Sequence, residues 1–174
     1  MQIEVPDRRL DLEGWRHLRA AAVPVDGALT ARLIAGGRSN LTFHVQDDRS
    51  RWILRRPPVG HVLATAHDMS REHVVLRALA PTTVPTPARV HLCEDVSVIG
   101  APLLLVDDVD GPVVLDRTAA RAIAPADARR ASETLVDVLA EIHEVPVDAV
   151  GLAGLGRPDG FLARQLRRWR RQCC

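Results

Sequence analysis

The stretch RWILRRPPVGHVLATAHDMSREHVVLRALA (51–80) joins a strand-like segment that ends in two arginines to a helix that carries a glutamate. In the helix, Glu72 lies three and four residues before Val75 and Leu76, so it shares their apolar face. A carboxylate on a buried face needs a cation, because burial of an unpaired charge is strongly unfavourable. Two interpretations follow: Glu72 pairs with a cation beneath the helix, or it points outward at the edge of the apolar face.

The strand-like segment supplies two candidate cations on opposite faces. Because side chains alternate along a strand, Ile53 and Arg55 share one face, whereas Arg56 lies on the other. We expect Arg55 to be the partner of Glu72, with Arg56 as the second candidate. The alternative is that Arg55 is an ordinary surface arginine.

The segments around this stretch indicate an α+β fold. Apolar and polar residues alternate in short segments separated by polar or glycine turns, which is typical of an antiparallel meander. We expect a five-stranded, mainly antiparallel sheet, flanked by a helix over residues 67–80 and followed by a helical tail from about residue 113. The expected strands are residues 29–35, 41–46, 51–56, 88–93 and 103–106, and the other expected helices are residues 11–21, 125–142 and a last one from about residue 158.

Composition disfavours several classes of protein. Hydrophobic residues make up 47% and charged residues 26% of the 174 residues, a balance typical of soluble globular proteins. The net charge of +1 gives no reason to expect a nucleic-acid partner. No apolar run approaches the roughly 20 residues of a membrane helix, and residues 1–9 do not resemble a secretory signal. We therefore expect a cytoplasmic protein with no nucleic-acid and no membrane partner.

Side chains that could carry metal or redox chemistry are scattered along the sequence. The three cysteines do not suggest a disulfide framework, and the seven histidines have no zinc-ligand spacing with each other or with a cysteine. All 23 basic residues are arginine, so chemistry that needs a lysine cannot come from this chain. We expect no metal site.

The order of the expected elements is that of a protein-kinase-type N-terminal lobe, in which a cation on the third strand bridges nucleotide phosphates and a helix glutamate. GGRSNLTFHV (36–45), WILRRPPVGHVLATAHDMSREHVVLRAL (52–79), IGAPLLLVDDVDG (99–111) and LVDVLAEIHEV (135–145) resemble the aminoglycoside phosphotransferase/choline kinase-like family. Within it they are most similar to the bacterial branch related to the kinase-like domain fused to some acyl-CoA dehydrogenases. GRPDGFLARQLRRWRRQ (156–172) also resembles that branch.

The resemblance implies a nucleotide site on the N-terminal lobe. Residues 36–42 would form the flexible loop over the phosphates, and Arg55 stands where most of the wider family has a phosphate-binding lysine. Glu72 matches the helix glutamate, and residues 107–109 match the hinge whose backbone would read the adenine edge. The residues that the resemblance assigns to ATP are Gly37, Ser39, Asn40, Arg55, Glu72, Asp107 and Val109.

The same resemblance implies that catalysis is missing. The family carries its catalytic aspartate in an HGDxxxxN-like segment and its magnesium-binding aspartate further on, and this sequence contains no His-Gly-Asp triplet. His143 belongs to the helix that precedes that segment. We therefore expect no catalytic residue, weak ATP binding, and magnesium only together with a C-terminal lobe that this sequence lacks. On this interpretation, residues 1–111 are a nucleotide-binding lobe with an N-terminal helix, and residues 112–174 are the start of a truncated helical lobe.

Two other hypotheses use the last expected helix. Leu162, Leu166 and Trp169 would form an exposed apolar stripe that a complementary protein could cover, which makes a non-enzymatic protein-binding module the alternative function. Nucleic-acid binding by the arginines of that helix is disfavoured, because arginines around a helix are usually a solvated face. These arginines are Arg164, Arg167, Arg168, Arg170 and Arg171.

Overall fold

The computed structural model describes most of the chain after its first 25 residues. The predicted helix over residues 11–21 and the predicted phosphate-loop residues Gly37 and Ser39 lie outside the described part. The described residues are 26–34, 40–58, 68–114, 116–156 and 159–172.

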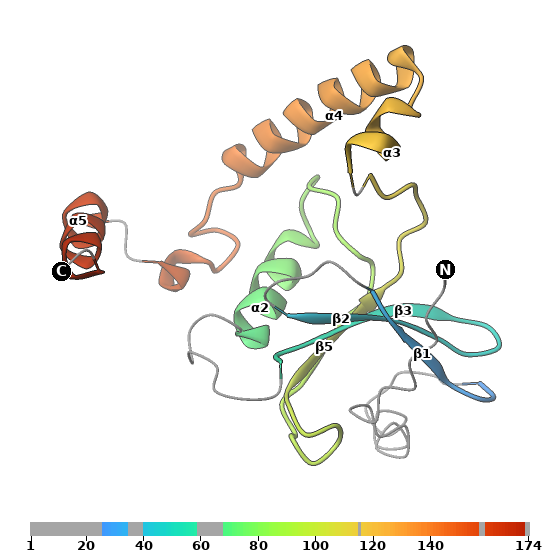
Figure 1. Ribbon diagram of the computed structural model, residues 1–174. Coiled ribbons are helices and arrows are strands. Elements are labelled where there is room, and N and C mark those ends of the chain that lie inside the picture. The colour runs from blue at the N-terminus through green and yellow to red at the C-terminus, as the bar shows by residue number, and fades with distance from the viewer. Residues whose placement is uncertain (1–25, 35–39, 59–67, 115, 157–158, 173–174) are drawn as a thin grey trace.

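A five-stranded sheet in the order β1-β2-β3-β5-β4 forms the body of the molecule (Figure 1). All four neighbouring pairs are antiparallel, which confirms the predicted α+β fold. The first three strands are neighbours in chain order and form a meander, and β5 then lies between β3 and β4. The strands are β1 Thr30–Leu33, β2 Leu41–Gln46, β3 Arg51–Arg56, β4 Val90–Cys93 and β5 Leu103–Asp107.

The turn between β2 and β3 fixes the register of the two strands. The Asp47 carboxylate accepts hydrogen bonds from the backbone amides of Arg49, at 2.8 Å, and Ser50, at 2.6 Å. Desolvation raises the pKa of Asp47, but the hydrogen bonds that its carboxylate accepts from backbone amides outweigh this and lower the pKa below its usual value. The ionised form therefore holds the turn that places Thr42 opposite Arg55.

Both faces of the central strands are covered. On one face, buried Phe43, Leu54 and Leu105 pack with Val98 and Ile99 of the segment between β4 and β5. On the other face, Leu104 and Val106 pack against Met69 and Leu76 of α2, which spans Met69–Leu79. The all-apolar run at 103–106 is therefore buried from both sides, as its composition indicates.

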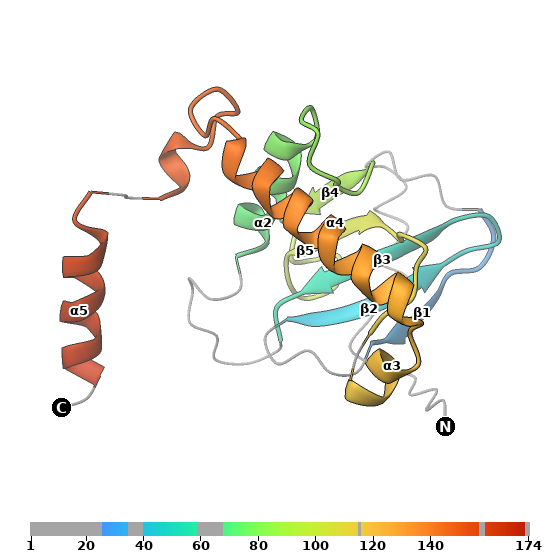
Figure 2. The same ribbon diagram turned by 90° about the horizontal axis from the view of Figure 1, so that it is seen from above.

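Helices make up most of the chain after the sheet, as predicted. They are α3 Arg117–Arg121, α4 Pro125–Glu144, the 3-10 helix Ala153–Leu155 and α5 Phe161–Gln172. No residue of α4 is buried, and α5 lies apart from the sheet in both views (Figure 1, Figure 2). In the described part of the chain, no helix is long and apolar enough to cross a membrane.

Candidate functional site

The predicted pair of Arg55 and Glu72 is present. Arg55 lies on the face of β3 that α2 covers, and its Nη1 donates a hydrogen bond to Oε1 of Glu72 in the first turn of α2. The side chains are 36% and 26% exposed, so the pair lies at the margin of the core and not inside it. Glu72 therefore points toward the sheet, and the outward-pointing alternative is wrong.

Backbone geometry brings the two side chains together. Asp68 caps α2, its carboxylate accepting from the backbone amide of Arg71 at 3.0 Å, and fixes where the helix begins. Met69, which is 2% exposed, then anchors the first turn on the sheet beside Leu104. Leu104 pairs with Arg55 in the register of β3 and β5. The first turn of α2, which carries Glu72, therefore lies over Arg55.

The Arg55 guanidinium is able to hold a second anion. Arginine carries five N–H donors in a planar fork, and the contact with Glu72 leaves donors for another acceptor. The side chain is 36% exposed, so it is partly open to solvent. A guanidinium of this kind suits a phosphate group, which accepts two parallel hydrogen bonds from the fork.

Arg56, the second candidate partner, lies on the other side of the sheet. It is 1% exposed, and it donates from Nη1 to the carbonyl of Ile99 at 3.0 Å and from Nε to the carbonyl of Pro57 at 3.3 Å. The alternation of side chains along β3 thus separates the two arginines completely: Arg55 faces α2, and Arg56 ties the sheet to the segment that covers its opposite face.

The other predicted site residues divide between the two ends of β3. Asn40 directly precedes β2 and lies at the end where Arg55 lies, because Leu41 pairs with Arg56. Asp107 is opposite Trp52 at the other end. Trp52 and Arg55 are three residues apart on β3, so Asp107 lies roughly 10 Å along the strand from Arg55. Among the described residues, Asn40 and Arg55 therefore lie at one end of β3, and Asp107 lies beside the other end.

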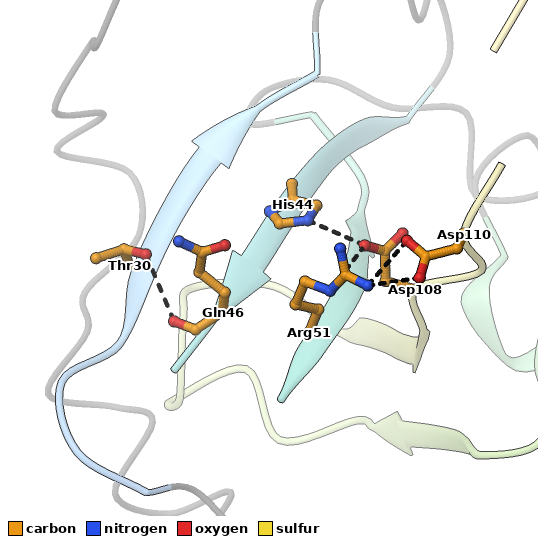
Figure 3. Close-up of polar contacts among 6 residues, drawn as sticks. All are labelled: Thr30, His44, Gln46, Arg51, Asp108 and Asp110. Atoms are coloured by element: carbon orange, nitrogen blue, oxygen red, sulfur yellow. Dashed lines mark hydrogen bonds and ion pairs between the residues drawn. The ribbon is translucent and has the colours of Figure 1, made fainter. Parts of the chain in front are cut away.

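The acidic connector, residues 107–110, begins at the last residue of β5 and is held by side chains that were not predicted as site residues (Figure 3). Nε2 of His44 lies 3.0 Å from Oδ2 of Asp108, and Nη2 of Arg51 donates to both carboxylate oxygens of Asp110 at 2.8 Å. Val109, between the two aspartates, is 71% exposed. Side chains alternate along β2 and β3, so the sequence alone could have shown that His44, Arg51 and Arg55 share one face of the sheet.

The magnesium ion that the resemblance implies does not fit the described residues. No group of three or more histidine, cysteine, aspartate or glutamate side chains there could hold a metal ion. The three carboxylates of the connector are engaged by Arg51, His44 and Arg89. No catalytic step is therefore assigned to a metal in this part of the chain.

Comparison with known proteins gives concordant results. The model of the phosphotransferase enzyme family matches residues 30–173. Acyl-CoA dehydrogenase family member 11 of Gallus gallus is 36% identical over 146 residues, which are 84% of this chain and 18% of that protein. The human protein of the same name is 31% identical over 173 residues, 97% of this chain and 22% of that protein. The probable acyl-CoA dehydrogenase IBR3 of Arabidopsis thaliana is 35% identical over 141 residues, 78% of this chain and 17% of that protein.

A solved structure shares the fold. A crystal structure of a Ralstonia eutropha protein assigned to the aminoglycoside phosphotransferases superposes with a TM-score of 0.73 at 30% sequence identity. The match covers 93% of this chain and 46% of that protein. The chain thus spans about a fifth of the acyl-CoA dehydrogenase relatives and about half of the solved structure.

Proposed function

Because this chain belongs to the phosphotransferase enzyme family, we propose that it binds ATP on the sheet face that carries Arg55 and that, on its own, it does not transfer the phosphate. Residues 1–111 form the nucleotide-binding lobe in this proposal, and residues 112–174 are the first helices of the helical lobe. The proposal also includes a cytoplasmic location, where ATP is abundant.

The contact between Arg55 and Glu72 carries the proposal. It joins a strand cation to a helix carboxylate, the arrangement that orders nucleotide phosphates in kinase-like lobes. Glu72 orients the guanidinium, and Arg55 lies at the end of β3 beside which Asn40 precedes β2. Gly37, Ser39 and Asn40 would complete the phosphate site in this proposal. Arg55 would hold phosphate oxygens there with two parallel hydrogen bonds.

The base would lie at the other end of the same face. Val106, which is 9% exposed, and half-buried Ile53 belong to the apolar cluster on that face, and the connector at Asp107 and Val109 follows directly. The backbone of this connector would read the adenine edge. The affinity is expected to be low, because these residues cover only one side of a nucleotide.

The absence of transfer follows from what phosphoryl transfer requires. The reaction depends on positioning of the acceptor hydroxyl and on neutralisation of charge at the transferred group, usually by magnesium. The sequence contains no His-Gly-Asp triplet, and the described residues offer no magnesium ligand set. We therefore assign no catalytic residue to this chain, and we expect a magnesium requirement only when a C-terminal lobe is present.

Titration calorimetry of the purified chain with ATP tests this function. Arg55→Ala is expected to weaken ATP binding about tenfold to a hundredfold, because hydrogen bonds to a charged group contribute about 1.5–3 kcal/mol. Arg49→Ala is the matched control, since Arg49 is an exposed arginine of the turn after β2 that pairs with Asp26. Equal affinities of the wild type and Arg55→Ala, or no binding by the wild type, would contradict ATP binding.

Phosphate transfer is measured with the same protein, ATP, magnesium and a panel of alcohols, sugars and aminoglycosides. Turnover that survives stringent purification and disappears in Arg55→Ala would overturn the proposed inactivity. The assay thereby separates the two halves of the proposal, nucleotide binding and lack of transfer.

The helical tail favours a second function, that of a protein-binding module. Leu135 of α4 and Leu162 and Trp169 of α5 are 70%, 75% and 58% exposed. Several exposed apolar side chains on neighbouring turns of a helix are typical of a surface that another protein covers. The partner would be a protein that offers an apolar groove to α5.

Self-association of the purified chain checks this surface. We expect oligomers whose mass rises with protein concentration in light scattering, because apolar side chains of α4 and α5 are exposed among the described residues and can bury one another. Leu162→Arg with Trp169→Arg is expected to reduce that association. A sharp monomer peak, with little binding of a dye that reports exposed apolar surface, would contradict the interpretation.

A further inference from the structure

The acidic connector is tied to the sheet on both of its faces. Asp107 and Asp108 are consecutive, so their side chains leave the extended backbone in opposite directions. On one face, Nε of Arg89 donates to Oδ1 of Asp107 at 2.8 Å, and the backbone amide of Arg89 donates to Oδ2 at 3.0 Å. On the other face, Asp108 contacts His44 of β2.

Arg51, the first residue of β3, bridges this second face. Its Nη2 contacts both oxygens of Asp110 at 2.8 Å, and its Nε lies 4.0 Å from Oδ2 of Asp108 (Figure 3). The carbonyl of Arg51 also accepts the backbone amide of Asp108 at 3.3 Å. One arginine therefore holds the connector through a backbone contact and through two carboxylates that flank Val109.

The contacts in this cluster differ in burial and so in strength. Asp108 and His44 are 17% and 20% exposed, whereas Asp110 is 81% exposed. Exposed ion pairs contribute little to stability, so the half-buried contacts of Asp108 carry most of the restraint. These contacts immobilise one short segment of backbone and contribute little to the packed core.

We infer that His44 and Arg51 are positioning residues that hold the connector backbone where it can read a nucleotide base. This inference rests on the proposed function, because it assigns a purpose to the connector in ATP binding. A ligand that meets an already ordered backbone loses less conformational freedom on binding, so the contacts raise affinity for the base. Arg51 also offsets the negative charge of Asp110, which would otherwise repel an anionic nucleotide.

Two ligands separate a positioning role from a phosphate-binding role. ATP carries base and phosphates, whereas inorganic tripolyphosphate carries phosphates alone and would contact only the Arg55 end. His44→Leu is expected to weaken ATP about fivefold to tenfold. Arg51→Ala, which removes mainly the ion pair with exposed Asp110, is expected to weaken ATP less, about threefold. Both variants are expected to leave tripolyphosphate within about twofold. His44→Gln, whose amide can still donate to Asp108, is expected to recover most of the loss. Equal weakening of both ligands would overturn the inference.

Hydrogen exchange supplies a readout that needs no ligand. In Arg51→Ala, the amides of residues 107–110 are expected to exchange faster, while those of α2 keep their wild-type rates. Arg49→Ala, two residues away on the same turn, is the control and is expected to change neither region. Unchanged exchange at 107–110 in Arg51→Ala and His44→Leu would overturn the inference whether or not nucleotide binds. Failure of the wild type to bind ATP, with faster exchange in the variants, would overturn only the nucleotide role.

Discussion

Leu104→Ala is expected to lower the free energy of unfolding by about 2–5 kcal/mol, the range for truncation of a large buried aliphatic side chain. Leu104, the second residue of β5, is fully buried opposite Arg55 and packs with Met69 of α2. The truncation removes apolar contacts and leaves a cavity between the sheet and the helix that carries Glu72. Urea unfolding followed by tryptophan fluorescence, to which buried Trp52 contributes, measures the loss.

Leu162→Ala is the matched control for this prediction. Leu162 is 75% exposed on α5, so the same chemical change should alter the free energy of unfolding by less than about 0.5 kcal/mol. If Leu104→Ala does not fold, Leu104→Met conserves volume and should cost less than about 1.5 kcal/mol. Similar losses in Leu104→Ala and Leu162→Ala would show that α2 does not pack on β5 as described.

Arg56→Ala is expected to cost about 2–4 kcal/mol, because it removes a buried side chain and the donor to a buried carbonyl. Ile99, whose carbonyl accepts from Arg56, is 5% exposed, so little water can replace the lost donor. The segment between β4 and β5 would lose its tie to β3. Thermal and urea unfolding of the variant would report the change.

Arg49→Ala again provides the comparison for Arg56→Ala. The Arg49 side chain is 80% exposed and contacts Asp26 at 2.8 Å, an exposed ion pair that contributes about 0–1 kcal/mol. A tolerated Arg56→Ala, with a loss no larger than that of Arg49→Ala, would contradict the burial of Arg56. It would also place the covering segment around Ile99 away from the sheet.

Much of the fold could be predicted from local patterns. The bounds of β2 and β3 agree with the predicted residues 41–46 and 51–56, because alternation of side chains is clear there and polar or proline residues follow both strands. The choice of Arg55 over Arg56 as the partner of Glu72 followed from the same alternation. The predicted strand over residues 88–93 begins only at Val90.

The contacts of the connector could not be predicted. His44 and Asp108 are 64 residues apart in the chain, and they meet because β5 inserts beside β3 and not beside β4 alone. Strand order depends on packing of the whole sheet, which no local pattern reports. From the sequence, the acidic connector was predicted only to offer backbone groups to a nucleotide. The side chains of His44 and Arg51 that contact it were not predicted. The proposed roles of Gly37 and Ser39 stay predictions, since both residues lie outside the described part of the chain.

The neighbouring arginines at the end of β3 have a consequence for mutational libraries. The two positions carry the same amino acid, but one side chain is 36% exposed beside a helix carboxylate and the other is buried on the opposite face. In a scan that scores cellular abundance separately from ligand capture, adjacent codons would therefore give different profiles. Substitutions at Arg56 would lower the cellular abundance of the protein. Many substitutions at Arg55 would leave the abundance unchanged and lower only ligand capture.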